Sequence, residues 1–304
     1  MRMLILAQER HSYTTRRLVE VGRTAGHTVV VRSPFRFRLG FASAVDIDGL
    51  TVPRSQVVIP RFGRSIETYG VAVLAQLEML GVPALNTAHA IEMVRNRPRC
   101  LQQLIAQGIA VPHSVLVRHG SDVATAVAAV GGLPVMLRRV SGAPTSGALF
   151  CETEQGCLAA IEALWGFGHE VLISEQLPTI ASDGIRCLVV NGALVAAVRR
   201  KGHTVRTRFR FSPRGKATEI RPTAKLRDLA VRTAAATGLL VAGIDLVESD
   251  HGFKILEVNA VPGLEQLETT TGRDLARLII DAASAVARPD GARAPRPRKK
   301  QRRA

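Results

Sequence analysis

The stretch of sequence that decides the fold is KILEVNAVPG, residues 254–263. Its first half has the apolar residues of a buried strand, and a Pro-Gly turn ends it. Alternate side chains of a strand share a face, so Glu257 and Asn259 are expected on the same side. A carboxylate buried there needs a cation or a hydrogen-bond donor. Two interpretations stay open at this point: an edge strand with one polar face in water, or a binding site.

A second lone acid supports the binding site. Asp245 ends the apolar run AGID, just as Glu257 interrupts the apolar strand that follows it along the chain. Upstream of both, residues 199–216 (RRKGHTVRTRFRFSPRGK) carry Lys and Arg throughout and no acid. Such a segment is typical of a surface that meets an anionic ligand.

Length and composition bound the class of protein. With 304 residues, 46% hydrophobic and 22% charged, the chain is long enough for two or three globular domains. No apolar run approaches the roughly 18 residues that a membrane helix needs, and the N-terminus MRMLILAQERHS has the pattern of a strand, not of a signal peptide. A cytoplasmic protein without membrane contact is expected. The four cysteines lack CxxC spacing and the histidines lack HExxH, which gives a zinc site little support.

The net charge of +16 is unevenly distributed. The tail 287–304 is rich in Pro, Ala and Arg, without apolar periodicity, so it is predicted to be disordered. From Arg288 onward it holds eight Lys or Arg against one acid, which supplies +7 of the total. Two roles remain open for this tail: binding of a polyanion such as nucleic acid, and a solubilising extension without a specific partner.

The order of elements predicts two architectures in one chain. Strands and helices alternate over residues 1 to about 95, which indicates a parallel α/β unit whose ligands meet the strand ends near Arg61 and Arg64. Beyond two helices at about residues 89–107, short strands dominate. Among them VVNGALVAA is an Asn-Gly hairpin. The second part is therefore predicted to be α+β with antiparallel sheets.

Several long motifs resemble one superfamily. They are VVIPRFGRSIETYGVAVLAQLEMLGVPALN, LIAQGIAVP, DGIRCLVVNGALVAAVRR, VAGIDLV and EVNAVPGLEQLETTTGRDLA. The chain resembles the ATP-grasp ligases, and most closely the RimK-type glutamate ligases, up to about residue 286. The resemblance implies an N-terminal α/β domain over residues 1–97 and an ATP-grasp domain over 98–286. The latter divides into a central subdomain at about 112–175 and a C-terminal subdomain at about 176–286, whose antiparallel sheets clasp the nucleotide.

The same resemblance gives the opening stretch a role. Asp245, Glu257 and Asn259 match the family's metal ligands, which hold two Mg²⁺ (or Mn²⁺) ions against the phosphates of ATP. Hard cations of this kind prefer such oxygen ligands. The implied reaction is phosphorylation of a carboxyl group by ATP, followed by attack of an amine. The family adds L-glutamate to a protein or peptide C-terminus, with a ribosomal protein as the target. The sequence leaves another amino acid, and a homo-oligomer, open.

The nucleotide side departs from the family. Arg138 and Arg97 stand where the family has phosphate-binding lysines, and arginine differs from lysine in reach and geometry. The glycine-rich loop is reduced to SGAPTSG, residues 141–147. The family's Arg-x-Asn is Arg206-Thr207-Arg208, which places an extra cation near the metals and ATP.

Other positions that match the family lie toward the adenine base of ATP and the reacting groups. Glu175 and Gln176 match the segment that contacts the adenine. Arg186 matches the arginine of Asp-Ile-Arg, but the acid is missing because Gly184 occupies its place. Asp183, one residue early, replaces that acid only if the strand bulges. Arg186 and Arg206 are the expected catalytic residues.

Four arginines are candidates for recognising carboxylates, since a guanidinium matches that geometry bidentately: Arg61, Arg64, Arg199 and Arg200. The departures leave two interpretations, an active ligase with an arginine-rich site and a degenerate module that binds or regulates. A nucleic-acid-binding protein is a third. Only Phe209 and Phe211 offer stacking in the basic segment, and no helix-turn-helix, zinc-finger or RNP motif occurs.

Overall fold

The computed structural model describes residues 1–41, 45–48, 55–63, 66–140, 148–177, 183–201, 217–249 and 252–287. At residues 41, 45–48, 67, 183 and 201 this description covers the backbone alone. Several predictions fall outside the described residues. They concern Arg64, the loop 141–147, the triplet Arg206-Thr207-Arg208 and the tail from residue 288.

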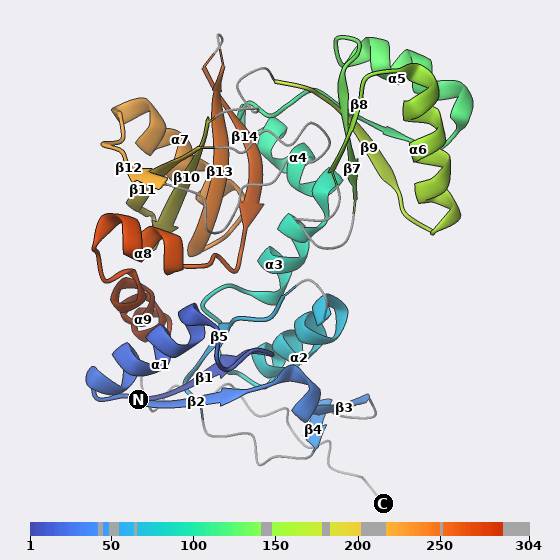
Figure 1. Ribbon diagram of the computed structural model, residues 1–304. Helices are drawn as coiled ribbons and strands as arrows, with labels where there is room; N and C mark the ends of the chain where they lie inside the picture. Colours follow the sequence, from blue (N-terminus) through green and yellow to red (C-terminus); the bar gives the residue numbers. More distant parts are fainter. Residues whose placement is uncertain are drawn as a thin grey trace, which may run out of the picture.

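The N-terminal part is a small parallel sheet with helices against it (Figure 1). Strand β1 lies between β2 and β5, and both pairings are parallel, as predicted. A short hairpin of β3 and β4, which the sequence did not predict, follows β2. The elements are β1 (Arg2–Leu6), α1 (Tyr13–Thr24), β2 (Thr28–Arg32), η1 (Pro34–Arg36), β3 (Arg38–Phe41), β4 (Val45–Asp48), β5 (Val57–Pro60) and α2 (Glu67–Met79).

Two helices lead from this part to a four-stranded antiparallel sheet of order β6-β9-β7-β8, with α5 and α6 on its outer side (Figure 1). Asn96 ends the first linking helix and caps the second, accepting from the backbone N–H of Arg99 at 3.1 Å. The elements are α3 (Ala88–Arg95), α4 (Arg97–Ala106), β6 (Ser114–Val117), η3 (Gly120–Asp122), α5 (Val123–Ala129), β7 (Val135–Arg139), β8 (Ala148–Cys151), α6 (Glu154–Gly166) and β9 (Val171–Glu175).

The C-terminal part is a five-stranded antiparallel sheet of order β12-β11-β10-β13-β14. The Asn-Gly hairpin joins its strands β10 and β11. Both turn residues have positive φ, 48° at Asn191 and 75° at Gly192, as a tight hairpin turn of this type requires. The elements are β10 (Asp183–Val190), β11 (Ala193–Lys201), β12 (Ala217–Glu219), α7 (Ala224–Ala236), β13 (Val241–Ser249), β14 (Gly252–Asn259), α8 (Glu265–Thr271) and α9 (Leu275–Val286).

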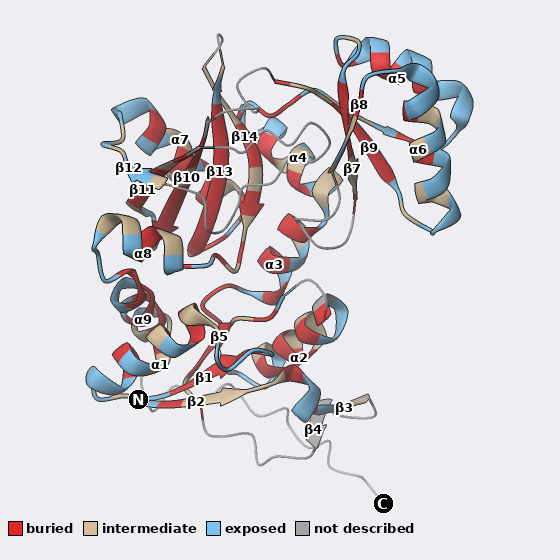
Figure 2. Ribbon diagram, in the orientation of Figure 1, coloured by how far each residue is buried: buried red, intermediate tan, exposed pale blue. Residues whose placement is uncertain are grey.

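The two faces of the five-stranded sheet have different coverings. One face packs its apolar side chains, among them Cys187, Ile244 and Leu246, with those of α3, α4 and α7. The other face has Leu188 and Val198 in a core with α8, α9 and the N-terminal sheet. Figure 2 shows β10 and β13, in the middle of this sheet, as largely buried, whereas the edge strand β12 is intermediate to exposed. Farther along this second face the side chains become polar, and the candidate site lies there.

Helix α9 returns to the start of the chain. It packs on α1 and β5, so a C-terminal helix completes the N-terminal core (Figure 1). The parallel α/β unit and the antiparallel α+β part are both confirmed. Within the described residues, no helix combines the length and the apolar character needed to cross a membrane.

Candidate active site

Three charged residues form one row across adjacent strands of the C-terminal sheet. Arg186 of β10 lies directly opposite Asp245 of β13, and Asp245 lies directly opposite Glu257 of β14. Residues that face each other in an antiparallel pair have Cβ atoms about 5 Å apart. The two acids that the sequence singled out are therefore immediate neighbours, close enough to share a cation.

The register of β13 and β14 contains a β-bulge within this row. Asp245 pairs with Glu257 but Leu246 pairs with Ile255, so Leu256 is the extra residue. Bulges are frequent beside active sites because they re-aim side chains. Here the bulge brings Lys254 onto the same face as Glu257, although the two residues are three positions apart. Regular alternation would have placed them on opposite faces.

Asn259 continues the row at the end of β14, opposite Gly243. Its Oδ1 accepts a hydrogen bond from the backbone N–H of Val261 at 2.8 Å and so shapes the turn that follows. A Cβ at position 243 would approach the Cβ of Pro262 to 2.8 Å. Gly243 is therefore the residue that lets the turn pack down over β13 beside the two acids.

The row is partly buried and its central ion pair is tight. Nε of Arg186 donates to Oδ1 of Asp245 at 2.6 Å, and Nη2 donates to Oδ2 of the same carboxylate. Burial lowers the pKa of Arg186, but the charge of Asp245, its hydrogen bonds and the charge of Glu257 outweigh this, and the net pKa is raised. Arg186 is thus a permanent cation between the site and the core.

Arg200 lies beside this pair, opposite Gly184 on β10. Burial, followed by the neighbouring charge of Arg186, lowers the pKa of Arg200 to about 10. The ladder from Asp183 to Leu188 is continuous, so the bulge that Asp183 would need is missing. The prediction that Asp183 replaces the family's acid is therefore corrected: it is Gly184 that is in phase with Arg186, and Arg200 faces a position without a side chain.

Two further arginines approach Glu257 from other elements. Nη1 of Arg97, at the start of α4, donates to the carbonyl oxygen of the bulged Leu256 at 3.4 Å. Arg138 comes from β7 of the four-stranded sheet, which is the central sheet of the chain, and is half-buried. Its pKa is lowered to about 10 by burial and by the charge of Arg97, while the charge of Glu257 raises it. The structure therefore gathers Arg97, Arg138 and Glu257 between the two sheets.

Glu175, at the end of β9, connects the two sheets. Its Oε1 accepts from the backbone N–H of His113 at 2.9 Å and from the ammonium group of Lys254. Burial raises the pKa of Glu175, but these two donors outweigh it and the net pKa is lowered. Gln176 follows it, and Leu177 then packs with Val247 and Leu256 in a small apolar cluster. Lys254 was missed in the sequence because only the bulge turns it toward this site.

The arginines predicted to recognise substrate carboxylates differ in where they lie. Nη1 of Arg61, just after β5, donates to the carbonyl oxygen of Pro262 at 2.8 Å, and burial lowers the pKa of Arg61 to about 10. Its Nε is buried and makes no hydrogen bond within the described chain. Arg199 pairs with Ile185, so it lies on the opposite face from Arg186, and its Nη2 is 3.8 Å from Oε2 of Glu248. Its role toward a substrate carboxylate stays a prediction.

The residues present suit a magnesium ion. Mg²⁺ is usually held by one or two carboxylates together with phosphate oxygens and water. Asp245 and Glu257 supply the carboxylates, and Asn259 supplies an amide oxygen that has a second lone pair beyond its bond to Val261. In the part of the chain that the structure describes, no group of three or more His, Cys, Asp or Glu gathers. A metal here would therefore depend on oxygens from its substrate.

The antiparallel sheets that face each other across this row define an ATP-grasp enzyme. Family models match both parts of the chain: the RimK PreATP-grasp domain over residues 1–91 and the RimK-like ATP-grasp domain over residues 94–283. The chain belongs to the RimK-like ATP-grasp family. It is an ATP-dependent ligase of that type, which forms C–N bonds.

Relatives support the same conclusion. A probable alpha-L-glutamate ligase from Pseudomonas aeruginosa is 37% identical over 283 residues, which cover 92% of this chain and 94% of that protein. One from Azotobacter vinelandii is 37% identical over 284 residues, with the same two shares.

Solved structures share the fold at low identity. The ATP-grasp ligase PsnB, in complex with a phosphomimetic variant of its minimal precursor, Mg and ADP, has a TM-score of 0.72 and 20% identity, covering 94% of this chain and 98% of PsnB. The D-cycloserine synthetase DcsG has a TM-score of 0.73 and 18% identity, covering 93% of this chain and 99% of DcsG.

Proposed function

We propose that this protein is an ATP- and Mg²⁺-dependent α-L-glutamate ligase that extends the C-terminus of a protein or peptide. The observation that carries the proposal is the row Arg186–Asp245–Glu257, which faces Arg97 and Arg138. Two adjacent acids opposite two arginines suit a polyphosphate whose charge is shared between metal ions and guanidinium groups.

In this proposal Asp245, Glu257 and Asn259 hold the metal, with Mg²⁺ preferred and Mn²⁺ as a substitute. The metal would neutralise the charge that develops on the transferred phosphoryl group. Arg186 holds Asp245 in place before any ligand binds, through its two hydrogen bonds. By resemblance to the family, two metal ions are proposed to bind, and Arg206 is proposed to act in catalysis.

Arg97 and Arg138 are the proposed phosphate ligands, because they are cations from two different elements that meet at Glu257. The adenine base of ATP is proposed to lie at the Glu175–Lys254 pair, where Leu177, Val247 and Leu256 offer an apolar wall. Gln176 adjoins that wall. Thr207 and Arg208 keep their proposed contact with ATP by resemblance.

The chemistry balances in two steps. A carboxylate oxygen of the acceptor C-terminus attacks the γ-phosphorus of ATP, the bond to the β-phosphate oxygen breaks, and an acyl phosphate and ADP result. The amine of L-glutamate then attacks the acyl carbon, phosphate leaves, and the amine loses a proton. Arg61 and Arg200 are proposed to orient carboxylates, since Arg61 is a half-buried cation and Arg200 a buried one at the edges of the site.

A ribosomal protein as acceptor, a cytoplasmic location and attraction of the basic tail to a polyanion follow from resemblance and charge. The predicted domain boundaries at residues 97, 175 and 286 also stay proposals.

The test is phosphate release from ATP, with magnesium, a panel of amino acids and peptides ending in a free carboxylate, followed by mass spectrometry. Glutamate should give the fastest release and a peptide heavier by one or more glutamyl residues. The same peptide with an amidated C-terminus is the control and should remain unmodified. Preference for a neutral amino acid would overturn the glutamate assignment, and modification of the amidated peptide would overturn the acceptor assignment.

A further inference from the structure

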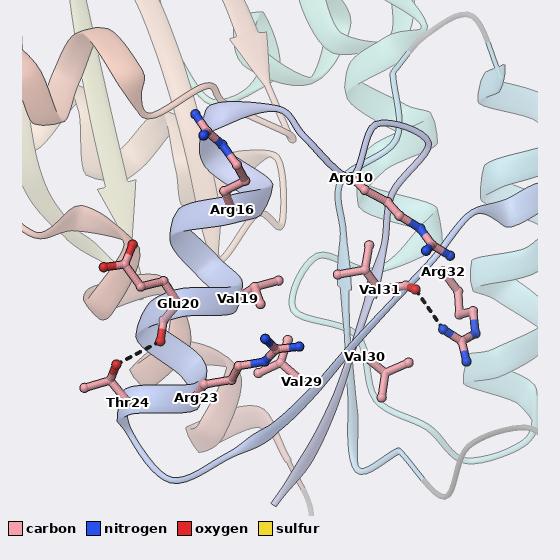
Figure 3. A pocket seen from close by; sticks show the side chains of 10 residues that line it. All are labelled: Arg10, Arg16, Val19, Glu20, Arg23, Thr24, Val29, Val30, Val31 and Arg32. Carbon is pink, nitrogen blue, oxygen red and sulfur yellow. Dashed lines mark hydrogen bonds between the residues drawn. The ribbon is translucent and has the colours of Figure 1, made fainter.

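A second basic site lies on the N-terminal part, away from the row of acids. Four arginines surround an open cavity of about 810 Å³ between α1 and β2: Arg10, Arg16, Arg23 and Arg32. Figure 3 shows them around a floor that includes Val19, Val29 and Val31. The cavity is therefore apolar below and cationic at its rim.

The fold assembles this rim from three separate elements. Arg16 and Arg23 are seven residues apart on α1, so they lie on the same side of the helix, two turns apart. Arg10 lies in the segment between β1 and α1, and Arg32 is the last residue of β2. The arginines thus follow the cavity from one end to the other.

The rim has little internal compensation of charge. The single acid that lines the cavity, Glu20, is bound by Nη1 of Arg17 at 2.8 Å, and Arg17 does not line the cavity. Arg10, Arg16 and Arg23 are exposed and form no ion pair with the described residues. Nη1 of Arg32 donates to the carbonyl oxygen of Val31 at 3.1 Å. Four positive charges therefore converge where an anion has access.

The wall formed by β2 is an open sheet edge. In the described chain β2 pairs with β1 alone. Thr28 N–H donates to Met1 at 2.9 Å and the Arg32 carbonyl accepts from Ala7 at 2.9 Å, so even-numbered residues turn their backbone toward β1. The backbone groups of Val29 and Val31 then point outward, and an extended peptide can pair with both groups of Val29 and with the N–H of Val31, while the Val31 carbonyl oxygen accepts from Arg32.

The cavity between α1 and β2, with its arginine rim and the open edge of β2, forms a groove. We infer that this groove binds an extended acidic peptide, and specifically the glutamate-rich tail that the enzyme itself produces; the identity of the tail rests on the proposed function. Open strand edges bind peptides through the backbone, and arginines at the rim match carboxylates. The lining contains no aromatic residue on which nucleic acid bases could stack. The groove therefore favours an acidic peptide over a single-stranded nucleic acid.

The groove lies within reach of the reaction site. Arg32 ends β2, and Arg61 follows β5 at the same carboxyl end of the parallel strands, where it contacts Pro262, three residues after Asn259. The two strands flank β1, so they are separated by two strand spacings, about 10 Å. About three extended residues cover that distance. A product with several added glutamates can thus occupy the groove and extend to Arg61 at the edge of the site.

The first experiment measures binding without ATP. A fluorescent oligoglutamate peptide is titrated into the wild type, into Arg16→Glu/Arg23→Glu and into the matched control Arg118→Glu/Arg227→Glu, whose arginines are exposed elsewhere. We expect about tenfold weaker binding in the groove variant alone, and weakening of wild-type binding by salt. Arg16→Gln/Arg23→Gln is a milder variant for the case that charge reversal disturbs α1. Equal loss in both double variants would overturn the proposal.

The second experiment separates this inference from the proposed function. In the ligation assay the groove variant should make the first addition at the wild-type rate but accumulate products with one to three glutamates. Unchanged product lengths would overturn the role as a tail site. If no glutamate is ligated at all while oligoglutamate still binds at the groove, the proposed function fails and the acidic-peptide site stands. Tighter binding of a single-stranded oligonucleotide of equal charge at the same residues would overturn the peptide assignment.

Discussion

Arg186 donates two hydrogen bonds to the carboxylate of Asp245, and Asp245 in turn lies directly opposite Glu257. One guanidinium therefore restrains one of two adjacent acids before any ligand arrives. A metal ion bound at this row can either share the Asp245 carboxylate with Arg186 or take the place of Arg186 as its cation. The balance between the two cations governs the stability of the site as well as its chemistry.

The first prediction concerns Arg186→Met. Loss of the guanidinium leaves Asp245 buried beside Glu257 without its cation, so the free energy of unfolding should fall by about 3 kcal/mol. Millimolar magnesium should recover more stability in this variant than in the wild type, because the metal compensates the same carboxylates. Denaturant unfolding with and without magnesium measures both effects. Arg227→Met, at an exposed position, is the control; wild-type stability of Arg186→Met without metal would contradict the argument.

The second prediction concerns Glu257→Gln. The amide keeps the size of the side chain but removes a charged metal ligand, so kcat should fall by about a hundredfold or more. The apparent magnesium requirement should rise, while the melting temperature changes by only a few degrees. Phosphate release at a series of magnesium concentrations tests this. Glu248→Gln on the neighbouring strand, whose carboxylate is exposed, should behave as the wild type.

Much of this site could be predicted from the sequence, because it depends on the two-residue period of strands. Glu257 and Asn259 share a face, and Asp245 ends an apolar run, so each could be identified locally. The antiparallel part was predictable for the same reason, since the Asn-Gly turn fixes the β10–β11 hairpin. The sequence also showed that Arg97 and Arg138 keep the positive charge of the family's lysines, and the structure brings both toward Glu257.

What could not be predicted depends on pairing between distant strands. The bulge at Leu256 arises from the register of β14 against β13, and it alone turns Lys254 toward Glu175. The faces on which Arg199 and Asp183 lie could not be predicted for a related reason. Adjacent residues of a strand point to opposite faces, and only the pairing of β10 with β11 decides which of them shares a face with Arg186. The packing of α9 on α1 joins residues more than two hundred positions apart, which no local pattern indicates.

The third prediction uses the depressed pKa of Arg138. Burial lowers its folded-state pKa to about 10, so folding disfavours the charged form of Arg138 at neutral pH. This destabilisation is absent only at strongly alkaline pH, where the side chain is neutral in the unfolded chain as well, and it is fully present once the pH has fallen through about 10. Arg138→Gln should therefore melt at the same or a higher temperature than the wild type. It should also lose most of the stabilisation that ATP provides.

Thermal shift with and without ATP and magnesium measures both quantities for Arg138. Arg138→Lys is the matched variant: it keeps the charge where the family has lysine, and should retain activity within about tenfold of the wild type. A large drop in melting temperature for Arg138→Gln, with an unchanged response to ATP, would assign Arg138 to the fold instead of the nucleotide.

The last prediction concerns the ion pair between Glu175 and Lys254, which ties the central sheet to β14. The folded-state pKa of Glu175 lies below its ordinary value of 4.5, so the pair contributes stability that is present above 4.5 and is lost as the pH falls through the lowered value. Glu175→Gln should therefore cost about 1–3 kcal/mol at pH 7, because it leaves a partly buried ammonium group with a weaker partner. The difference from the wild type should disappear in acid. Denaturant unfolding across that pH range provides the measurement, with the exposed Glu170→Gln as control. A difference that stays constant into strong acid would mean that Glu175 stabilises the protein by packing and not by its charge.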